Sequence, residues 1–397
     1  MAGRKPESAE HPKGHNKMKL LFASDSFKGT LSSEKTALLL EKAARDVFGE
    51  VECISVPVAD GGEGTTDAIL SATHGEKNNV QVHGPLMEPA SAYYGRFGNH
   101  RAIIEMAAAS GLPMVPPDLR NPLYTTTYGT GELIRNALDH GLSDLFIAIG
   151  GSATNDGGMG CSRALGIRFL DKDGNELEGK GEDLERVCSI DMSGLDPRIR
   201  SARITVLCDV TNPLCGKNGA TCTFSAQKGA SPDIQSRLEA GMQNYRDVIL
   251  RQFGVNPDIM EGAGAAGGLG CALMVFLGGK RKSGIETVLD LIDFDKRLEG
   301  VDLVVTGEGR TDWQSCFGKV MQGIGKRARA KGIPAVGLCG SLGKDACQIF
   351  DYGIDSLMTT VDAPMPLEEA LSRAEELYCL GAVRMFRLIR TGMEIRQ

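Results

Sequence analysis

The chain has 397 residues and a formal net charge of −7, and 42% of its residues are hydrophobic. This length exceeds that of a usual single domain, so we expect two domains, each with enough apolar residues for a core of its own. The acidic balance argues against binding to nucleic acid or to an anionic membrane surface, since both need clustered lysine and arginine. An anionic ligand would therefore have to be bound by local features.

Residues 1–17 are polar and lack periodicity, which predicts a disordered extension or tag before Met18. The 11 cysteines are scattered, with no C-x-x-C pair and no secretory leader, so a reducing, cytoplasmic location is expected. No apolar stretch approaches the length of a membrane span, so no membrane partner is expected. The expected partners are small-molecule substrates, and the sequence leaves open whether the protein forms a homo-oligomer.

A pattern of strand, charged glycine-rich loop and helix recurs along the chain. Residues 20–23 form the first predicted strand, which is followed by Asp25, Lys28 and a helix capped by Ser33. Four later strands are followed by these residues: Asp60, Gly61, Gly62 and Glu63; Gly150, Gly151, Asn155 and Asp156; Asp209; and Glu308, Arg310 and Asp312. Strands that alternate with helices predict parallel sheets, and the ends of these strands would share one edge.

Any one of these carboxylates is more often a turn former or a helix cap than a catalytic group. Five strand ends with carboxylates are harder to explain by stability alone, because like charges repel. A bound cation or a role in proton transfer would explain why they are gathered. Asp60, Asp156 and Asp209 are therefore predicted to hold Mg²⁺ or to accept a proton from a hydroxyl. Lys28 is predicted to bind an anion, because it precedes a helix N-terminus.

The stretch at residues 307–312 allows two interpretations. Arg310 could pair with Glu308 or Asp312 to balance a crowded strand end. Alternatively, Arg310 could present its planar guanidinium to a phosphoryl group or a carboxylate, with both acidic residues holding it or helping a metal.

Three other segments have features of anion-binding sites. Gly262, Gly264 and Gly267 have G-x-G-x-x-G spacing, but no strand precedes them, so they indicate either a phosphate cradle or tight packing of the helix at residues 269–276. Thr130 and Gly131 begin a second predicted helix, whose N-terminus could also bind an anion. The basic run at residues 280–282 is expected to be a solvated loop.

The six histidines lie outside the glycine-rich loops, which removes the usual parts of a hydrolytic triad or a zinc site. The sequence also lacks the G-x-x-x-x-G-K-[ST] pattern of a P-loop. Glycine loops, a few lysines and arginines, and several aspartates match phosphoryl transfer, which depends on positioning and charge neutralisation.

Eight ordered motifs, from "SDSFKGTLSS" through "PVADGGEGT", "YGTGELI", "GGSATNDGGMG", "CDVTNPLCG", "AQKGA" and "GAGAAGGLG" to "TGEGRTDWQS", resemble the bacterial glycerate kinase family. The resemblance implies Mg²⁺ and ATP as cofactors and transfer of the γ-phosphoryl group to D-glycerate, giving 2-phosphoglycerate. It also implies two α/β domains, one flavodoxin-like and one restriction-enzyme-like, with the site in the cleft between them. The sequence departs from the family pattern at Ser24, Trp313 and Met321, which affects the expected shape of the pocket.

Further candidates for binding substrate or phosphate lie within these motifs, at Ser26, Ser152, Thr154, Asn155, Asn212, Lys228, Gly264, Gly267 and Gly268. A composition shift at residues 83–98 suggests a discontinuous first domain of residues 18–80 plus 290–397, with residues 81–289 as the second. Two other functions stay open: a hydroxy-acid dehydrogenase that uses the glycines at 262–267 for a dinucleotide, and a non-catalytic glycerate sensor.

Overall fold

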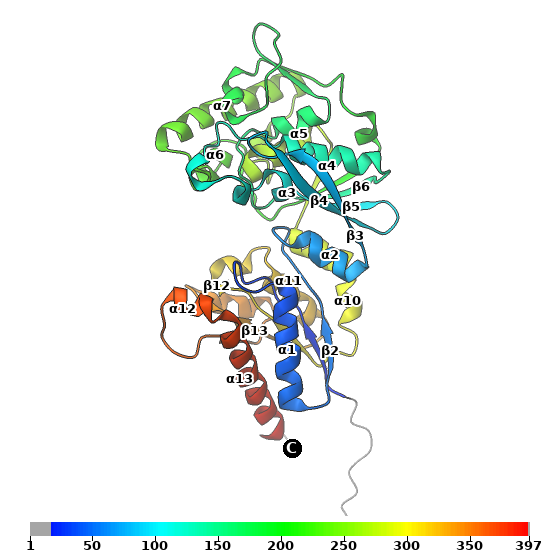
Figure 1. The fold of residues 1–397 in the computed structure, drawn as a ribbon, viewed down its shortest axis with the longest axis vertical. Helices are drawn as coiled ribbons and strands as arrows, with labels where there is room; N and C mark the ends of the chain where they lie inside the picture. Colours follow the sequence, from blue (N-terminus) through cyan, green and yellow to red (C-terminus); the bar gives the residue numbers. More distant parts are fainter. Residues whose placement is uncertain (1–16, 396–397) are drawn as a thin grey trace, which may run out of the picture.

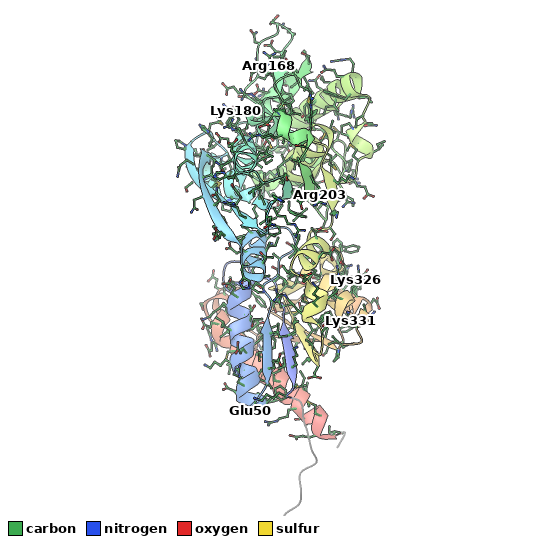
Figure 2. All side chains as sticks on the ribbon, turned by 90° about the vertical axis from the view of Figure 1, so that its right-hand side faces the viewer. Glu50, Arg168, Lys180, Arg203, Lys326 and Lys331 are labelled. Atoms are coloured by element: carbon green, nitrogen blue, oxygen red, sulfur yellow. The ribbon has the colours of Figure 1, made fainter. Side chains whose placement is uncertain are left out.

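The computed structural model describes residues 17–395, so the predicted extension lies outside the described residues except for Lys17. Figure 1 shows two lobes stacked along the long axis of the molecule, joined by a narrow waist near α2 (Thr65–Thr73). The side view of Figure 2 shows the same division, with Arg168 and Lys180 on one lobe and Lys326 and Lys331 on the other.

The first lobe contains a five-stranded sheet in which every strand pair is parallel. In spatial order the strands are β15 (Ser356–Thr359), β13 (Ala335–Cys339), β11 (Leu303–Thr306), β1 (Lys19–Phe22) and β2 (Glu52–Ser55). Numbered within this lobe alone, the order is 5-4-3-1-2, which is the order of flavodoxin-like sheets. The predicted α/β class and the flavodoxin-like lobe are therefore confirmed.

Alternating side chains of β1 face opposite layers of the first lobe. Leu20 and Phe22 pack with residues of α1 (Ser33–Phe48) and α13 (Ala374–Ile395). Leu21 lies on the other face, in a cluster with residues of α9 (Gly284–Leu291) and α11 (Val320–Ala330). Both faces are thus buried, which explains why the strands read as continuous apolar runs in the sequence.

The second lobe contains a six-stranded mixed sheet rather than a wholly parallel one. In spatial order its strands are β10 (Lys280–Lys282), β9 (Arg203–Leu207), β6 (Asp144–Ala148), β5 (Arg101–Glu105), β4 (Pro89–Phe97) and β3 (Glu76–His83). The pairs from β10 to β5 are parallel, whereas β5, β4 and β3 pair antiparallel. Residues 280–282 form a strand beside β9 and not the expected loop, whereas the side chains of Lys280 and Lys282 are exposed, as expected for solvated charge.

Helices cover the second sheet. They are α3 (Ala107–Ser110), α4 (Tyr128–Asp139), α5 (Met159–Ala164), α6 (Ala220–Phe224), α7 (Pro232–Phe253) and α8 (Leu269–Val275). One large apolar cluster fills the space between the sheet and these helices, and it contains Ile147 of β6, Leu133 of α4 and Met242 of α7.

A second apolar cluster crosses the waist and joins the two lobes. It contains Leu21 and Val304 from the first sheet together with Ile103, Phe146 and Leu207 from the second. The loops that follow β1 and β2 of the first sheet and β6 and β9 of the second line one cavity, so these loops meet between the lobes. The predicted domain boundaries stay a prediction, and β3, which crosses residue 80, pairs only within the six-stranded sheet.

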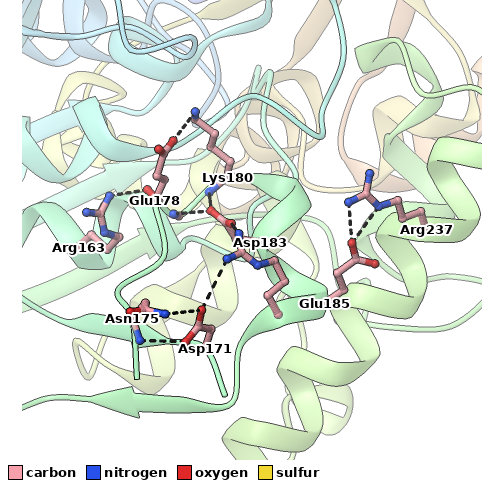
Figure 3. Close-up of polar contacts among 10 residues, drawn as sticks. Arg163, Asp171, Asn175, Glu178, Lys180, Asp183, Glu185 and Arg237 are labelled. Atoms are coloured by element: carbon pink, nitrogen blue, oxygen red, sulfur yellow. Dashed lines mark hydrogen bonds and ion pairs between the residues drawn. The ribbon is translucent and has the colours of Figure 1, made fainter. Parts of the chain in front are cut away.

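Polar contacts organise the loop region of the second lobe far from the waist. Asp183 accepts hydrogen bonds from the backbone amides of Gly179 and Lys180, at 2.9 and 3.1 Å. Figure 3 shows these contacts beside the ion pair between Arg237 of α7 and Glu185. These charges fix surface loops of the lobe and lie apart from the candidate site.

The cap of α1 differs from the prediction by one residue. Ser32 is the N-cap, and its side chain accepts a hydrogen bond from the amide of Lys35. Ser33 instead donates through Oγ to the carbonyl oxygen of Ser24, at 2.6 Å, and accepts from the amide of Val58, at 3.2 Å. Ser33 therefore ties the loops after β1 and β2 to the start of α1.

We predict that Ser33→Ala destabilises the protein more than Ser32→Ala. The first change leaves a partly buried amide and carbonyl without their partner, at a cost of about 1–3 kcal/mol. The second removes an exposed cap and costs about 1 kcal/mol. Urea unfolding of both variants measures the difference, and a larger loss for Ser32→Ala would contradict this assignment.

Candidate active site

A cavity of about 700 Å³ lies between the lobes, and we call it the central cavity. Nine of the predicted site residues line it: Lys28, Asp60, Gly61, Gly62, Glu63, Gly151, Ser152, Asp209 and Lys228. They come from the loops after β1, β2, β6 and β9 and from the segment after α6. The predicted meeting of strand ends therefore occurs, but across two facing sheets rather than on one edge.

Glycines allow the backbones of the two lobes to approach closely around Asp60 and Asp209. A Cβ atom at Gly284 would lie 2.0 Å from the carbonyl oxygen of Asp60, and one at Gly318 would lie 2.6 Å from Cγ of Asp209. Gly61, with φ of +92°, faces Gly284, where a Cβ atom would come within 3.1 Å of the Gly284 Cα. Side chains at these positions would push the two carboxylates apart.

Asp209 is partly buried at the N-terminus of α9. Both of its carboxylate oxygens lie 3.1 Å from the amide nitrogen of Gly284, which donates to them. Burial raises the pKa of Asp209 to about 6, and the nearby charge of Asp60 acts in the same direction. A carboxylate with such a pKa is ionised at neutral pH and is still a better proton acceptor than an ordinary aspartate.

Lys228 is a buried cation at the wall of the central cavity, with 2% of its surface exposed. Its Nζ donates to Ser152 Oγ and to the carbonyl oxygen of Thr154, both at 2.7 Å. Burial lowers the pKa of Lys228 to about 7, and Asp156 counteracts this only in part. Since an ammonium group has three donors, one more bond is available for an anionic ligand.

Asp156 does not line the central cavity, although it was predicted to be a base or a metal ligand. It is fully buried, and its oxygens accept hydrogen bonds from the backbone and side chain of Thr127 and from the amides of Gly158 and Gly160. Burial raises its pKa. The position corrects the prediction, because Asp156 holds the loop after β6 to the start of α4 and cannot reach a ligand.

The glycines at 264, 267 and 268 also lie away from the cavity wall. A Cβ atom at Gly264 would lie 2.1 Å from the carbonyl oxygen of Pro213, and one at Gly267 would lie 2.1 Å from that of Thr154. Tight packing therefore explains the glycines themselves. The run still reaches the central cavity through Ala265 and Ala266, so a phosphate cradle formed by its backbone stays a prediction. α8, which follows, has only 7 residues.

Three further candidates have structural contacts. Thr154 and Asn155 are fully buried, and Asn155 donates to Thr221 Oγ1 at 3.1 Å. Asn212 donates to the carbonyl oxygen of Asn218 at 2.8 Å. None of the three lines the central cavity.

The remaining candidates surround a second cavity of about 620 Å³ at the edge of the first sheet, which we call the sheet-edge cavity. Ser26, Glu308 and Arg310 line it, and Lys28 lines both cavities. Arg310 is exposed and lies 3.6 Å from Asp312, measured from Nε to Oδ2. Asp312 accepts a hydrogen bond from the amide of Gln314, and the side chains of Thr311 and Ser315 donate to Glu308.

Two charged residues that were not among the candidates also belong to the site. Asp25 lies directly after β1, and burial raises its pKa to about 7, with Asp60 and then Glu308 adding to the effect. Lys319 is the N-cap residue of α11 and lines both cavities. The sequence signal for Asp25 was its place at a strand end, and the signal for Lys319 was its place before an apolar helix.

The site offers oxygen donors that suit Mg²⁺, but not a complete protein cage. Across residues 17–395, no group of three or more His, Cys, Asp or Glu residues is arranged to hold a metal ion. Mg²⁺ commonly uses one or two carboxylates together with substrate phosphates and water. Asp60 beside Asp209, or Asp25 beside Glu308, fits that partial set of ligands.

Comparisons with known proteins agree with this arrangement. The family model described as "Glycerate kinase family" matches residues 20–390. A glycerate kinase of Bacillus subtilis strain 168 is 46% identical and covers 90% of this chain and 94% of its own. A glycerate 2-kinase of Escherichia coli K12 is 44% identical and covers 95% and 99%.

The fold has a close counterpart among solved structures. A crystal structure from Salmonella typhimurium LT2, named "putative glycerate kinase 2", is 43% identical, has a TM-score of 0.84 and covers 96% of this chain and 100% of that one. The two lobes and the cavity between them thus define a two-lobed α/β enzyme fold. The chain belongs to the glycerate kinase family. Within its described part, no helix is both long and apolar enough to span a membrane.

We predict that Asp25→Asn stabilises the ligand-free protein at pH 8. A carboxyl whose folded pKa is raised contributes stability that is fully present below its unfolded pKa, about 4, and that is lost as the pH rises through about 7. The variant should therefore melt at a higher temperature than the wild type at pH 8, and the gap should narrow at pH 5. Exposed Asp46→Asn is the control, and an unchanged gap between the two pH values would contradict the assignment.

Proposed function

We propose that the protein transfers the γ-phosphoryl group of ATP to the 2-hydroxyl of D-glycerate, giving 2-phosphoglycerate, with Mg²⁺ as the metal. One observation carries the proposal: Asp60 and Asp209 meet in a cavity that also presents Lys28 and Lys228. The carboxylates supply a proton acceptor and metal-binding oxygens, and the lysines supply positive charge for a carboxylate and for phosphates. Family membership supports the same substrate class.

Asp209 is the proposed general base. In the transfer, the bond from the γ-phosphorus to the β–γ bridging oxygen breaks and a bond to the glycerate oxygen forms. The proton of that hydroxyl moves to the Asp209 carboxylate, and ADP leaves. The Gly284 amide keeps Asp209 oriented toward the cavity through its two contacts.

Lys228 is the proposed partner of the glycerate carboxylate, together with the side chain of Ser152. Its Nζ is already fixed by Ser152 Oγ and the Thr154 carbonyl, so little ordering is needed when the anion binds. A carboxylate held there keeps the adjacent C2 hydroxyl nearer to the lysine than the C3 hydroxyl. The name of the Escherichia coli relative, glycerate 2-kinase, supports the same position of transfer.

Asp60 is the proposed Mg²⁺ ligand, and Lys28, Lys319 and Arg310 are the proposed contacts of the phosphate chain. A bound Mg²⁺ would neutralise the negative charge of the phosphates. Glu308 and Asp312 would orient the loop that carries Arg310, through the contacts described above.

The two alternative functions find less support. A dehydrogenase would need the glycines at 262–267 to contact a dinucleotide, but Gly264 and Gly267 are packed against Pro213 and Thr154. A glycerate sensor would need no general base, whereas Asp209 combines burial with a raised pKa. Turnover separates both alternatives from the proposed kinase.

We expect the purified protein to release ADP from ATP only when D-glycerate and Mg²⁺ are both present. A coupled ADP assay across a panel of hydroxy acids measures this dependence. Phosphorus NMR of the product then distinguishes a phosphate on C2 from one on C3. A folded sample that releases no ADP with glycerate and excess Mg²⁺ would refute the proposal, and a C3 product would refute only the position of transfer.

We expect Asp209→Asn to lower kcat by about 10²- to 10⁴-fold, the usual contribution of a general base. In the wild type, kcat/KM should rise with pH through about 6, as Asp209 loses its proton. The variant should lack this rise. Asp302→Asn is the control, because Asp302 is exposed and directly precedes β11, at the opposite end of this strand from the loop at residues 307–312. Wild-type turnover in Asp209→Asn would show that another residue is the general base.

A further inference from the structure

The sheet-edge cavity has features that the roles assigned to the central cavity do not explain. It lies at the carboxyl ends of β1, β11, β13 and β15, and residues following each of these strands line it, including Phe27, Gly309, Ser341 and Thr360. In a sheet of flavodoxin order, the ligand-binding crevice opens between the strands here numbered β1 and β11. The cavity occupies that position, and its volume of about 620 Å³ is in the range of small-molecule sites.

The outer wall of the cavity is an apolar helix face that no part of the described chain covers. α12 (Leu367–Ser372) has no buried residue, and Leu367 and Leu371 are 73% and 47% exposed. Leu367, Ala370, Leu371 and Ala374 all line the cavity. Leu367, Ala370 and Leu371 have the i, i+3 and i+4 spacing of one face of α12, and Ala374 lines the cavity from the first residue of α13. An apolar helix face of this kind normally packs against something apolar.

The floor of the cavity is aromatic. The rings of Phe27 and Tyr378 meet edge to face with centroids 5.2 Å apart, and both residues line the cavity. Phe27 is 6% exposed and Tyr378 is fully buried, so Phe27 offers the surface that a ligand can touch and the packed Tyr378 ring holds it in place. An apolar wall opposite a rigid aromatic floor suits a flat ring system.

The inner end of the cavity is charged and continues into the central cavity. Lys28 and Lys319 line both cavities, and Arg310 lines the sheet-edge cavity beside them. Lys319 is also the N-cap of α11, an 11-residue helix, so the positive end of the helix dipole adds to these cations. Asp25 and Glu308 stand at the same end and supply oxygens for a divalent cation that accompanies phosphates.

We propose that the sheet-edge cavity binds the nucleoside of a nucleoside triphosphate, with the base between the α12 face and the Phe27–Tyr378 floor. The phosphate chain passes Lys28 and Lys319 into the central cavity, where the terminal phosphate meets the acceptor hydroxyl. This assignment rests on the proposed kinase function. It divides the site, with the nucleoside held by the first lobe alone and the acceptor held between the lobes.

Two pairs of variants on α12 test the assignment. Ala370→Phe fills the cavity, and Ser372→Phe places the same side chain on the same helix at a residue that does not line it. Leu371→Asp puts a negative charge on the apolar wall, and Ser372→Asp is its control. Because these positions are partly or fully exposed, the variants should fold, which circular dichroism would verify.

Binding of ADP with Mg²⁺, measured by calorimetry, and the KM values for ATP and D-glycerate are the readouts. We expect Ala370→Phe and Leu371→Asp to weaken ADP binding and raise the KM for ATP by about tenfold or more. The KM for glycerate should stay within about threefold of wild type, and both Ser372 variants should behave as wild type.

The outcomes separate this inference from the proposed function. Folded Ala370→Phe and Leu371→Asp proteins that bind ADP as tightly as wild type would overturn the assignment of the cavity, even if the wild type phosphorylates glycerate. A wild type that binds ADP but releases none from ATP with glycerate would refute the kinase function. In that case, selective loss of ADP binding in the α12 variants would still support the nucleoside site.

Discussion

The close backbone contact at Gly61, Gly284 and Gly318 is the constraint on which the candidate site depends. Two carboxylates from different lobes can share one cavity only because no side chain stands between them. Asp60 comes from a loop of the first lobe and Asp209 from the end of β9 in the second. The start of α9 completes the contact, since Gly284 both touches the Asp60 backbone and donates to Asp209. The same atoms of Gly284 therefore pack against Asp60 and position the Asp209 carboxylate.

Burial of charge is the second theme of the site. Asp25, Asp209 and Lys228 are all partly or fully removed from water, and burial is the largest influence on the pKa of each. Such groups destabilise a fold that has no ligand, and their charges become favourable when ions of opposite sign arrive. Stability given up in this way is common where binding sites must recognise charged substrates. The polar contacts of the second lobe around Asp183, by contrast, are satisfied within the protein.

The sequence predicted the α/β class, the strand ends and much of the central cavity, because these depend on local patterns such as an apolar run followed by Asp and Gly. Its errors concern contacts between distant residues. Asp156 resembles Asp60 locally, but its oxygens are taken by Thr127, which is 29 positions away. The charged run at 280–282 predicts a loop, and only the fold shows that it pairs with β9. The sequence alone does not mark Asp25 as a site residue, because its burial and the nearby charges of Asp60 and Glu308 both arise from the fold.

The apolar cluster at the waist limits how the enzyme can open. Ile103, Phe146 and Leu207 of the second sheet share it with Leu21 and Val304 of the first, all almost completely buried. A hinge motion that separated the sheets would expose these side chains to water, at about 25 cal/mol for each Å² of apolar surface. Substrates therefore enter through movement of loops and side chains at the rim of the central cavity, such as Trp313 and Phe317, while the two lobes stay in contact.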